Sequence, residues 1–214
     1  MLTNIKAAIF DLDGTLIDSM WIWEQIDIAY LSSKGFEQPE NLKDEINHLS
    51  FQETGVYFKN RFNLDDPIET ILDTWHDMAF THYSKDVTLK KGVIPFLDHL
   101  KNSGIKIGLA TSNHHSLLEA ALNCTGIYEY FDSITTTDEV AKGKDKPDVY
   151  LLAARKLGVD PKECIVFEDI LEAVRGAKLA DMKVVAMHDK AAKYQRHDLM
   201  CIADKYIYDF TEML

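Results

Sequence analysis

The chain has few cysteines and no long apolar run, and both scarcities limit its class. Among its 214 residues are three cysteines, Cys124, Cys164 and Cys201, which lie far apart and form no CxxC pair. Such cysteines favour reduced thiols over disulfides or a zinc site, so we expect a cytoplasmic protein. A membrane span needs about 18 or more consecutive apolar residues, and we expect neither such a span nor a signal peptide.

Basic residues are also in the minority. Lys and Arg number 23 against 35 Asp and Glu, which gives a formal net charge of −12. Such a chain repels nucleic acid and anionic membranes at long range, so we expect neither as a partner. A phosphate-binding site in this chain would therefore have to be made locally, by a metal ion and a few well-placed donors.

Strand and helix patterns alternate over most of the chain. Short apolar runs predict strands at residues 5–10, 105–110, 133–135, 164–167, 184–186 and 206–208, with helices between them. This alternation indicates an α/β fold, with a doubly wound, mainly parallel, Rossmann-like sheet that helices cover on both faces.

One long segment interrupts the alternation. From about Asp18 to Tyr83 the apolar residues recur at helical spacing, and no strand pattern is convincing. We therefore expect an α/β catalytic core made of residues 1–16 and 87–214, with a helical cap inserted at 17–86. An insertion at this point would lie beside the carboxyl ends of the strands, where open α/β sheets bind their ligands.

The segment Asp11-Leu12-Asp13-Gly14-Thr15 directly follows the first predicted strand. Residues two apart in an extended chain point to the same side, so the carboxylates of Asp11 and Asp13 can face one pocket. Two close carboxylates favour a bound cation or a shared proton, which suits a nucleophile paired with an acid/base group. The alternatives are a plain turn and a calcium loop, although an EF-hand needs its glycine at the sixth position and not the fourth.

Polar residues also follow the second core strand. Thr111, Ser112 and Asn113 offer hydroxyls and free backbone N–H groups just before a predicted helix. A helix N-terminus of this kind is a suitable phosphate cradle. The alternative is that Ser112 or Asn113 only caps the helix, and in the same way Asp18-Ser19 would cap the first inserted helix.

Two further motifs bring opposite charges to the same edge of the predicted sheet. Lys142, Lys144 and Lys146 lie in a loop before a helix, and the plain alternative is a solvated surface loop. Glu168 and Asp169 end the strand at 164–167. A pair of carboxylates suits Mg²⁺, whereas the alternative for Asp169 is helix capping.

In this order, the motifs resemble the haloacid dehalogenase superfamily, in its helical-cap branch of beta-phosphoglucomutase-like enzymes and sugar-phosphate phosphatases. The likeness covers essentially the whole chain. Thr111 matches the superfamily's Thr/Ser motif, and Glu168-Asp169 matches its acidic pair. Residues 144–148 match its Lys-Pro-x-Pro-Asp motif, with Asp145 in place of the first proline.

The resemblance implies an enzyme, a Mg²⁺-dependent phosphomonoesterase that acts on a small phosphorylated metabolite such as a sugar phosphate. Asp11 would attack phosphorus, and Asp13 would protonate the leaving oxygen and then activate water. Lys144 would neutralise the charge between the nucleophile and the phosphate. Lys146 is the other candidate for this role. Thr111, Ser112, Asn113 and Lys144 would hold the phosphate. Asp11, the carbonyl of Asp13, Asp169 and Glu168 would hold Mg²⁺, the last directly or through water.

Two other functions remain open. A sugar-phosphate mutase would carry a histidine at Trp23 and an arginine in the stretch that aligns with Ser50-Phe51-Gln52, and Phe51 has no charge for a second phosphate. Hydrolysis is therefore favoured. The other alternative is a non-catalytic phosphate-ligand-binding protein. The oligomeric state, monomer or small homo-oligomer, stays open.

The aromatic and histidine residues of the chain allow a weaker expectation. Trp21, Trp23, Phe51 and Tyr57 would either line the cap side of a pocket or, as is commoner for aromatics at helical spacing, form core. The eight histidines show no metal-binding spacing, so we expect them to be ordinary, with His114-His115 at most a minor contributor.

Overall fold

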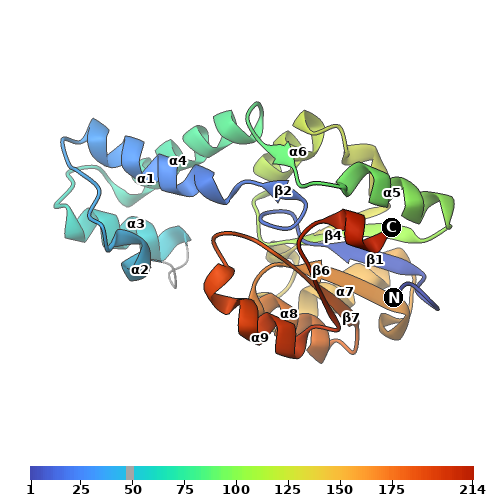
Figure 1. The fold of residues 1–214 in the computed structure, drawn as a ribbon. Helices are drawn as coiled ribbons and strands as arrows, with labels where there is room; N and C mark the ends of the chain where they lie inside the picture. The colour runs from blue at the N-terminus through green and yellow to red at the C-terminus, as the bar shows by residue number, and fades with distance from the viewer. Residues whose placement is uncertain (47–50) are drawn as a thin grey trace.

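The computed structural model describes residues 1–46 and 51–214 (Figure 1). A six-stranded sheet flanked by helices forms one part, and a group of four helices lies to one side of it, on the left in Figure 1. Within the described residues, no helix has the length and apolarity needed to cross a bilayer.

The sheet is wholly parallel, and its strand order is β5-β4-β1-β6-β7-β8. The predicted doubly wound α/β core is confirmed, and each predicted strand is present within two residues at either end. The strands are β1 (Ala7–Phe10), β4 (Lys106–Thr111), β5 (Ser133–Thr136), β6 (Cys164–Glu168), β7 (Lys183–Met187) and β8 (Lys205–Ile207).

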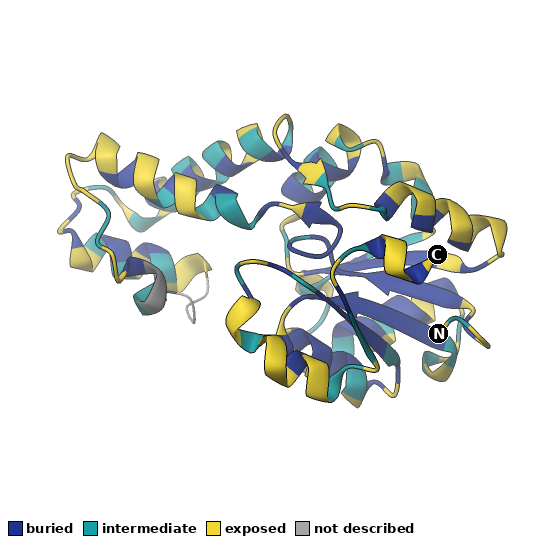
Figure 2. Cartoon of the chain, viewed as in Figure 1, coloured by how far each residue is buried: buried dark blue, intermediate teal, exposed yellow. Residues whose placement is uncertain are grey.

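Helices cover both faces of this sheet because each strand buries both of its faces. Ala8 and Phe10 pack in one apolar cluster, whereas Ala7 and Ile9 pack in another on the opposite face. Figure 2 shows the strands in dark blue between helices whose outer sides are exposed. The helices are α5 (Val93–Asn102), α6 (His115–Cys124), α7 (Asp148–Leu157), α8 (Leu171–Leu179) and α9 (Arg196–Ile202). Short 3₁₀ turns lie at Tyr128–Tyr130, Thr137–Glu139, Pro161–Glu163, Lys193–Gln195 and Phe210–Met213.

The helical group consists of α1 (Met20–Ser33), α2 (Leu42–Ile46), α3 (Phe51–Arg61) and α4 (Ile68–Tyr83). Its helices pack on apolar side chains that belong to the same buried cluster as Phe10 of the sheet, and within this cluster Phe58 and Trp75 meet edge to face with ring centroids 4.7 Å apart. These two rings help to hold α3 against α4.

Two short strands connect the helical group to the sheet. β2 (Ile17–Asp18) pairs antiparallel with β3 (Thr88–Leu89), so both connections run side by side. The expectation of no strand from about Asp18 to Tyr83 is therefore wrong only at its first residue, where β2 ends. Two residues are too few to display the alternation by which a strand is recognised in a sequence.

Candidate active site

The loop after β1 turns sharply at the carboxyl edge of the sheet. Gly14 has φ +78°, and its N–H donates to the carbonyl of Ile17 at 3.1 Å. A Cβ at this position would lie 2.3 Å from Asp169 Oδ2. Only glycine allows both the left-handed backbone and this close approach, which brings the β1 loop against the end of β6.

Asp11 and Lys144 form a buried ion pair at the same edge. Lys144 Nζ lies 2.5 Å from Asp11 Oδ1 and 2.6 Å from Glu168 Oε1, and all three side chains are buried. Burial alone would lower the pKa of Lys144, but the charges of Asp11 and Glu168 outweigh it and raise that pKa above its ordinary value. Lys146, by contrast, is exposed and pairs with Asp145 at 3.2 Å.

Three buried carboxylates gather around this lysine. One oxygen each of Asp11, Glu168 and Asp169 lies within 4.8 Å of the others. Burial raises the pKa of Asp169 well above its ordinary value, and the nearby charges of Asp11 and Glu168 add to this effect. Burial likewise raises the pKa of Glu168 to about 8. The structure thus brings together three carboxyl groups whose full ionisation one ammonium could not balance.

This cluster fits a divalent metal. Oε1 of Glu168 accepts a hydrogen bond from Tyr150 at 2.8 Å, while Oε2 is buried and has no hydrogen-bond partner in the part of the chain that the structure describes. An unpartnered buried carboxylate oxygen is costly unless a cation compensates it. Carboxylate oxygens are the ligands that hard divalent cations prefer. Asp11, Glu168 and Asp169 could therefore hold such an ion.

Asp13 accepts hydrogen bonds from three other side chains. Ser19 Oγ and Tyr83 Oη donate to its Oδ1 at 2.7 and 2.5 Å, and Asn113 Nδ2 donates to its Oδ2 at 2.7 Å. Burial and the charge of Asp11 raise the pKa of Asp13, while these three hydrogen bonds oppose the rise. Asp13 is thus partly protected from ionisation and fixed in orientation.

Ser19 occupies the expected N-cap position of α1, but its side chain makes no capping hydrogen bond and donates to Asp13 instead. By contrast, neither Ser112 nor Asn113 is the N-cap of α6. That position belongs to His114, which has extended backbone and no side-chain cap. The backbone N–H of Asn113 donates to Thr111 Oγ1 at 3.0 Å.

A pocket of about 440 Å³ opens over these groups. Its lining includes all eight residues singled out from the sequence motifs: Asp11, Asp13, Thr111, Ser112, Asn113, Lys144, Glu168 and Asp169. The helical group adds Met20, Trp23, Phe51, His76 and Tyr83, and the sheet side adds His114, Leu117, Asp138 and Ile170. The pocket therefore lies between the sheet edge and the helical group.

Of the four aromatic residues named from the sequence, two line the pocket and two do not. Trp23 and Phe51 line the pocket, with ring centroids 5.8 Å apart. Trp21 instead donates through Nε1 to the carbonyl of Asp18, and the Tyr57 hydroxyl donates to Glu45. Ser50, the first residue of the stretch compared with the mutase arginine region, lies outside the described residues.

His76 lies at the pocket, which the spacing of the eight histidines did not indicate. Its Nε2 lies 2.8 Å from Ser116 Oγ, and both His76 and His114 line the pocket. His76 and Tyr83 are seven residues apart on α4, so they share one helix face. In the sequence, this spacing was the only sign that His76 and Tyr83 could face the same pocket.

The sequence of the chain was also compared with known families. A model of the haloacid dehalogenase-like hydrolase family matches residues 5–181, which is most of the chain. The chain belongs to the haloacid dehalogenase-like hydrolases. The resemblance read from the motifs is thereby confirmed.

Individual relatives match this hydrolase over most of its length. It is 26% identical to hexitol phosphatase B of Escherichia coli K12, over 98% of this chain and 95% of that protein. It is 28% identical to a phosphorylated carbohydrates phosphatase of Thermotoga maritima, over 84% of this chain and 83% of that protein. The crystal structure of CbbY from Rhodobacter sphaeroides in complex with phosphate superposes with a TM-score of 0.82 and 26% identity, covering 98% of this chain and 96% of that one.

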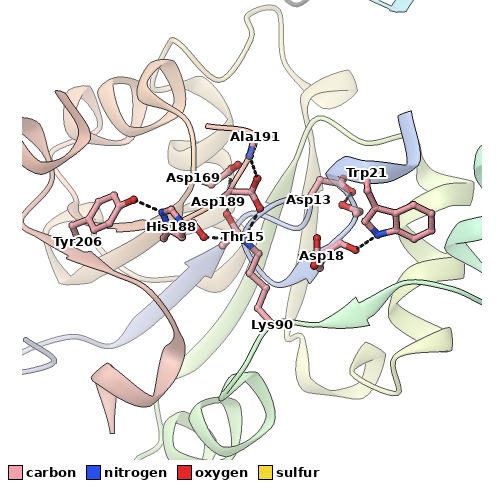
Figure 3. Close-up of polar contacts among 11 residues, drawn as sticks. Asp13, Thr15, Asp18, Trp21, Lys90, Asp169, His188, Asp189, Ala191 and Tyr206 are labelled. Carbon is pink, nitrogen blue, oxygen red and sulfur yellow. Dashed lines mark hydrogen bonds and ion pairs between the residues drawn. The ribbon is translucent and has the colours of Figure 1, made fainter. Parts of the chain in front are cut away.

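Another ion pair of the hydrolase lies close to Asp169, and no motif pointed to it. Lys90, just after β3, donates to Asp189 Oδ2 at 2.7 Å and to the carbonyl of His188 at 3.0 Å. Figure 3 shows this pair close to Thr15, which donates to Asp169 Oδ1 at 3.4 Å. Lys90 thus links the segment that leads from the helical group back to the sheet, at β3, with the loop after β7.

Proposed function

We propose that this hydrolase is a Mg²⁺-dependent phosphomonoesterase that transfers phosphate through Asp11. The observation that carries the proposal is the meeting of Asp11, Lys144 and Asp169 in one buried cluster, with Asp13 two residues from the nucleophile. Phosphoryl transfer depends chiefly on positioning and on cancelling charge, and this cluster offers both.

The chemistry that we propose has two steps. An Asp11 oxygen attacks phosphorus, the bond from phosphorus to the ester oxygen breaks, and Asp13 gives its proton to the departing oxygen. A water then attacks the phosphoaspartate and gives a proton to Asp13, and the bond to Asp11 breaks to release phosphate. Both steps move a proton at Asp13, so its dual role requires a carboxyl that ionises near working pH.

Lys144 would cancel the repulsion between the Asp11 carboxylate and a phosphate dianion, because it is already 2.5 Å from Asp11 Oδ1. Thr111, Ser112 and Asn113 would bind the phosphate oxygens. Asp11, Asp169, Glu168 and the carbonyl of Asp13 would hold Mg²⁺. The bound ion would supply a Lewis acid for the phosphoryl oxygens.

For the substrate we propose a small phosphorylated metabolite of the hexitol or sugar type. Names of relatives point to phosphorylated hexitols and carbohydrates. Trp23 and Phe51 offer aromatic faces on the helical side of the pocket, where a second phosphate group would need cationic side chains. A mutase that handles a bisphosphate is therefore not favoured.

We further propose that residues 1–16 and 87–214 act as the catalytic core and 17–86 as the cap, and that the enzyme works in the cytoplasm. The pocket has lining residues from both parts. The cap would then close the pocket over the substrate and exclude water other than the attacking molecule.

A phosphatase screen with Mg²⁺ tests this function. The panel would include hexitol, sugar and aryl phosphates, nucleotides and pyrophosphate, each with and without EDTA. We expect phosphate release from at least one hexitol or sugar phosphate, with no bisphosphate activator and with loss of activity in EDTA. Conversion of beta-glucose 1-phosphate to glucose 6-phosphate with negligible free phosphate would instead establish a mutase. Tight binding without turnover would establish a binding protein.

A further inference from the structure

The hydrogen bonds around Asp13 divide unequally between its two oxygens. Among the described residues, Ser19 Oγ and Tyr83 Oη both donate to Oδ1, whereas Asn113 Nδ2 alone donates to Oδ2. A carboxylate offers about two acceptor sites on each oxygen. The three donors therefore occupy both sites of Oδ1 and leave one site of Oδ2 for a proton.

Tyr83 is, like Ser19, a fully buried donor to Oδ1. It is the last residue of α4 and has no exposed surface, and its hydroxyl donates to Asp13 from a position 70 residues along the chain. Its ring belongs to the apolar cluster that also contains Phe10. A buried ring cannot easily rotate away, so its hydroxyl stays directed at Oδ1.

We propose that Tyr83 is a positioning residue that keeps Oδ1 of Asp13 occupied, so that Oδ2 carries the proton that is transferred. The inference rests on the proposed function, in which Asp13 is the acid and then the base. The proton leaves Oδ2 for the ester oxygen as the bond from that oxygen to phosphorus breaks. In the second step the attacking water returns a proton to Oδ2.

Removing the hydroxyl alone tests this role. In Tyr83→Phe the ring still fills its site, but one acceptor position of Oδ1 is free. The proton can then reside on Oδ1, which is turned toward Ser19, and protonation of the leaving group becomes less effective. This loss matters for an alkoxide, which needs a proton to depart, and hardly matters for p-nitrophenolate.

The experiment compares kcat/KM for p-nitrophenyl phosphate, phenyl phosphate and a hexitol phosphate in wild type, Tyr83→Phe and Asp13→Asn. This parameter reports the steps up to departure of the leaving group, so slower hydrolysis of the phosphoaspartate does not blur the comparison. Tyr130→Phe is the matched control, because the Tyr130 hydroxyl also donates to an aspartate, Asp98, at 2.7 Å, but outside the pocket.

We expect Tyr83→Phe to lose roughly 10- to 100-fold on the hexitol phosphate and about threefold or less on p-nitrophenyl phosphate, since acid catalysis contributes about 10²–10⁴-fold in all. Asp13→Asn is expected to show the same trend more strongly, and Tyr130→Phe no change. If Tyr83→Phe does not fold, Ser19→Ala frees the same oxygen and is expected to give the Tyr83→Phe pattern.

The outcomes separate the two proposals. An equal loss on all three substrates in Tyr83→Phe, beside a leaving-group-dependent loss in Asp13→Asn, overturns the role of Tyr83 and leaves the proposed function standing. An equal loss in Asp13→Asn itself removes Asp13 as the acid, and the inference about Tyr83 fails with it.

Discussion

Lys144 and Asp11 meet at 2.5 Å although 133 residues separate them in the chain. Gly176 of α8 makes this meeting possible, because a Cβ there would lie 1.9 Å from the carbonyl oxygen of Lys144. The helix can therefore press the lysine-bearing loop against the end of β1. The ion pair depends on packing that no local motif encodes.

The lysines of this loop give a first prediction. Lys144→Ala should reduce turnover by on the order of 10³-fold, because it leaves Asp11 without its buried counter-charge. Lys146→Ala and Lys142→Ala remove exposed charges and should stay within a few fold of wild type. Steady-state phosphate release measures all three. An inactive Lys146→Ala beside an active Lys144→Ala would show that the wrong lysine has been chosen.

Glycine 14 gives a second prediction, with a control of similar backbone conformation. Gly14 has φ +78° and Gly35 has φ +83°, but a Cβ at Gly35 would meet nothing within 4 Å. Gly35→Ala should therefore cost only the backbone strain, about 1–2 kcal/mol of unfolding free energy, and keep its activity. Gly14→Ala should cost more, because its methyl displaces the Asp169 carboxylate.

The readout for Gly14→Ala is the Mg²⁺ concentration at half-maximal activity, together with the shift of Tm that Mg²⁺ produces. We expect the required Mg²⁺ to rise by about tenfold or more, in the range seen when the surroundings of a metal ligand are disturbed. An unchanged Mg²⁺ requirement in a folded Gly14→Ala protein would argue against Asp169 as a ligand.

Asp27 gives a prediction about stability and pH. Burial, with the charge of Glu24, raises the pKa of Asp27 on α1 to about 7. The folded chain then binds more protons than the unfolded chain between the ordinary value near 3.8 and 7, so this carboxyl's contribution to stability falls as pH rises through that window.

Asp27→Asn removes this titration while keeping the shape. It should therefore raise Tm at pH 8, with a gain on the order of 1 kcal/mol after allowance for partial exposure, and change little at pH 4. Thermal melts at both pH values measure the effect, and Asp73→Asn on the exposed side of α4 is the control. An equal Tm change at both pH values would mean that ionisation of Asp27 is not the cause.

The sequence predicted the sheet well because its strands are short apolar runs separated by helices, and such periodicity is local. It also singled out Asp11, Lys144 and Asp169, since the ends of parallel strands meet at one edge and the motifs lie at those ends; their roles remain predictions. Tyr83 and Gly176 were missed. Each belongs to an ordinary helix and becomes informative only when long-range packing brings it to the site.

The central claim is that Asp11 is the nucleophile of a phosphohydrolase, and one variant tests it most directly. Asp11→Asn keeps the shape of the side chain and removes the attacking charge. On the best substrate of the screen, with Mg²⁺ present, we expect phosphate release to fall by on the order of 10³-fold or more in a protein that still folds. Retention of even about a tenth of wild-type turnover, well above what loss of a nucleophile allows, would contradict transfer through Asp11.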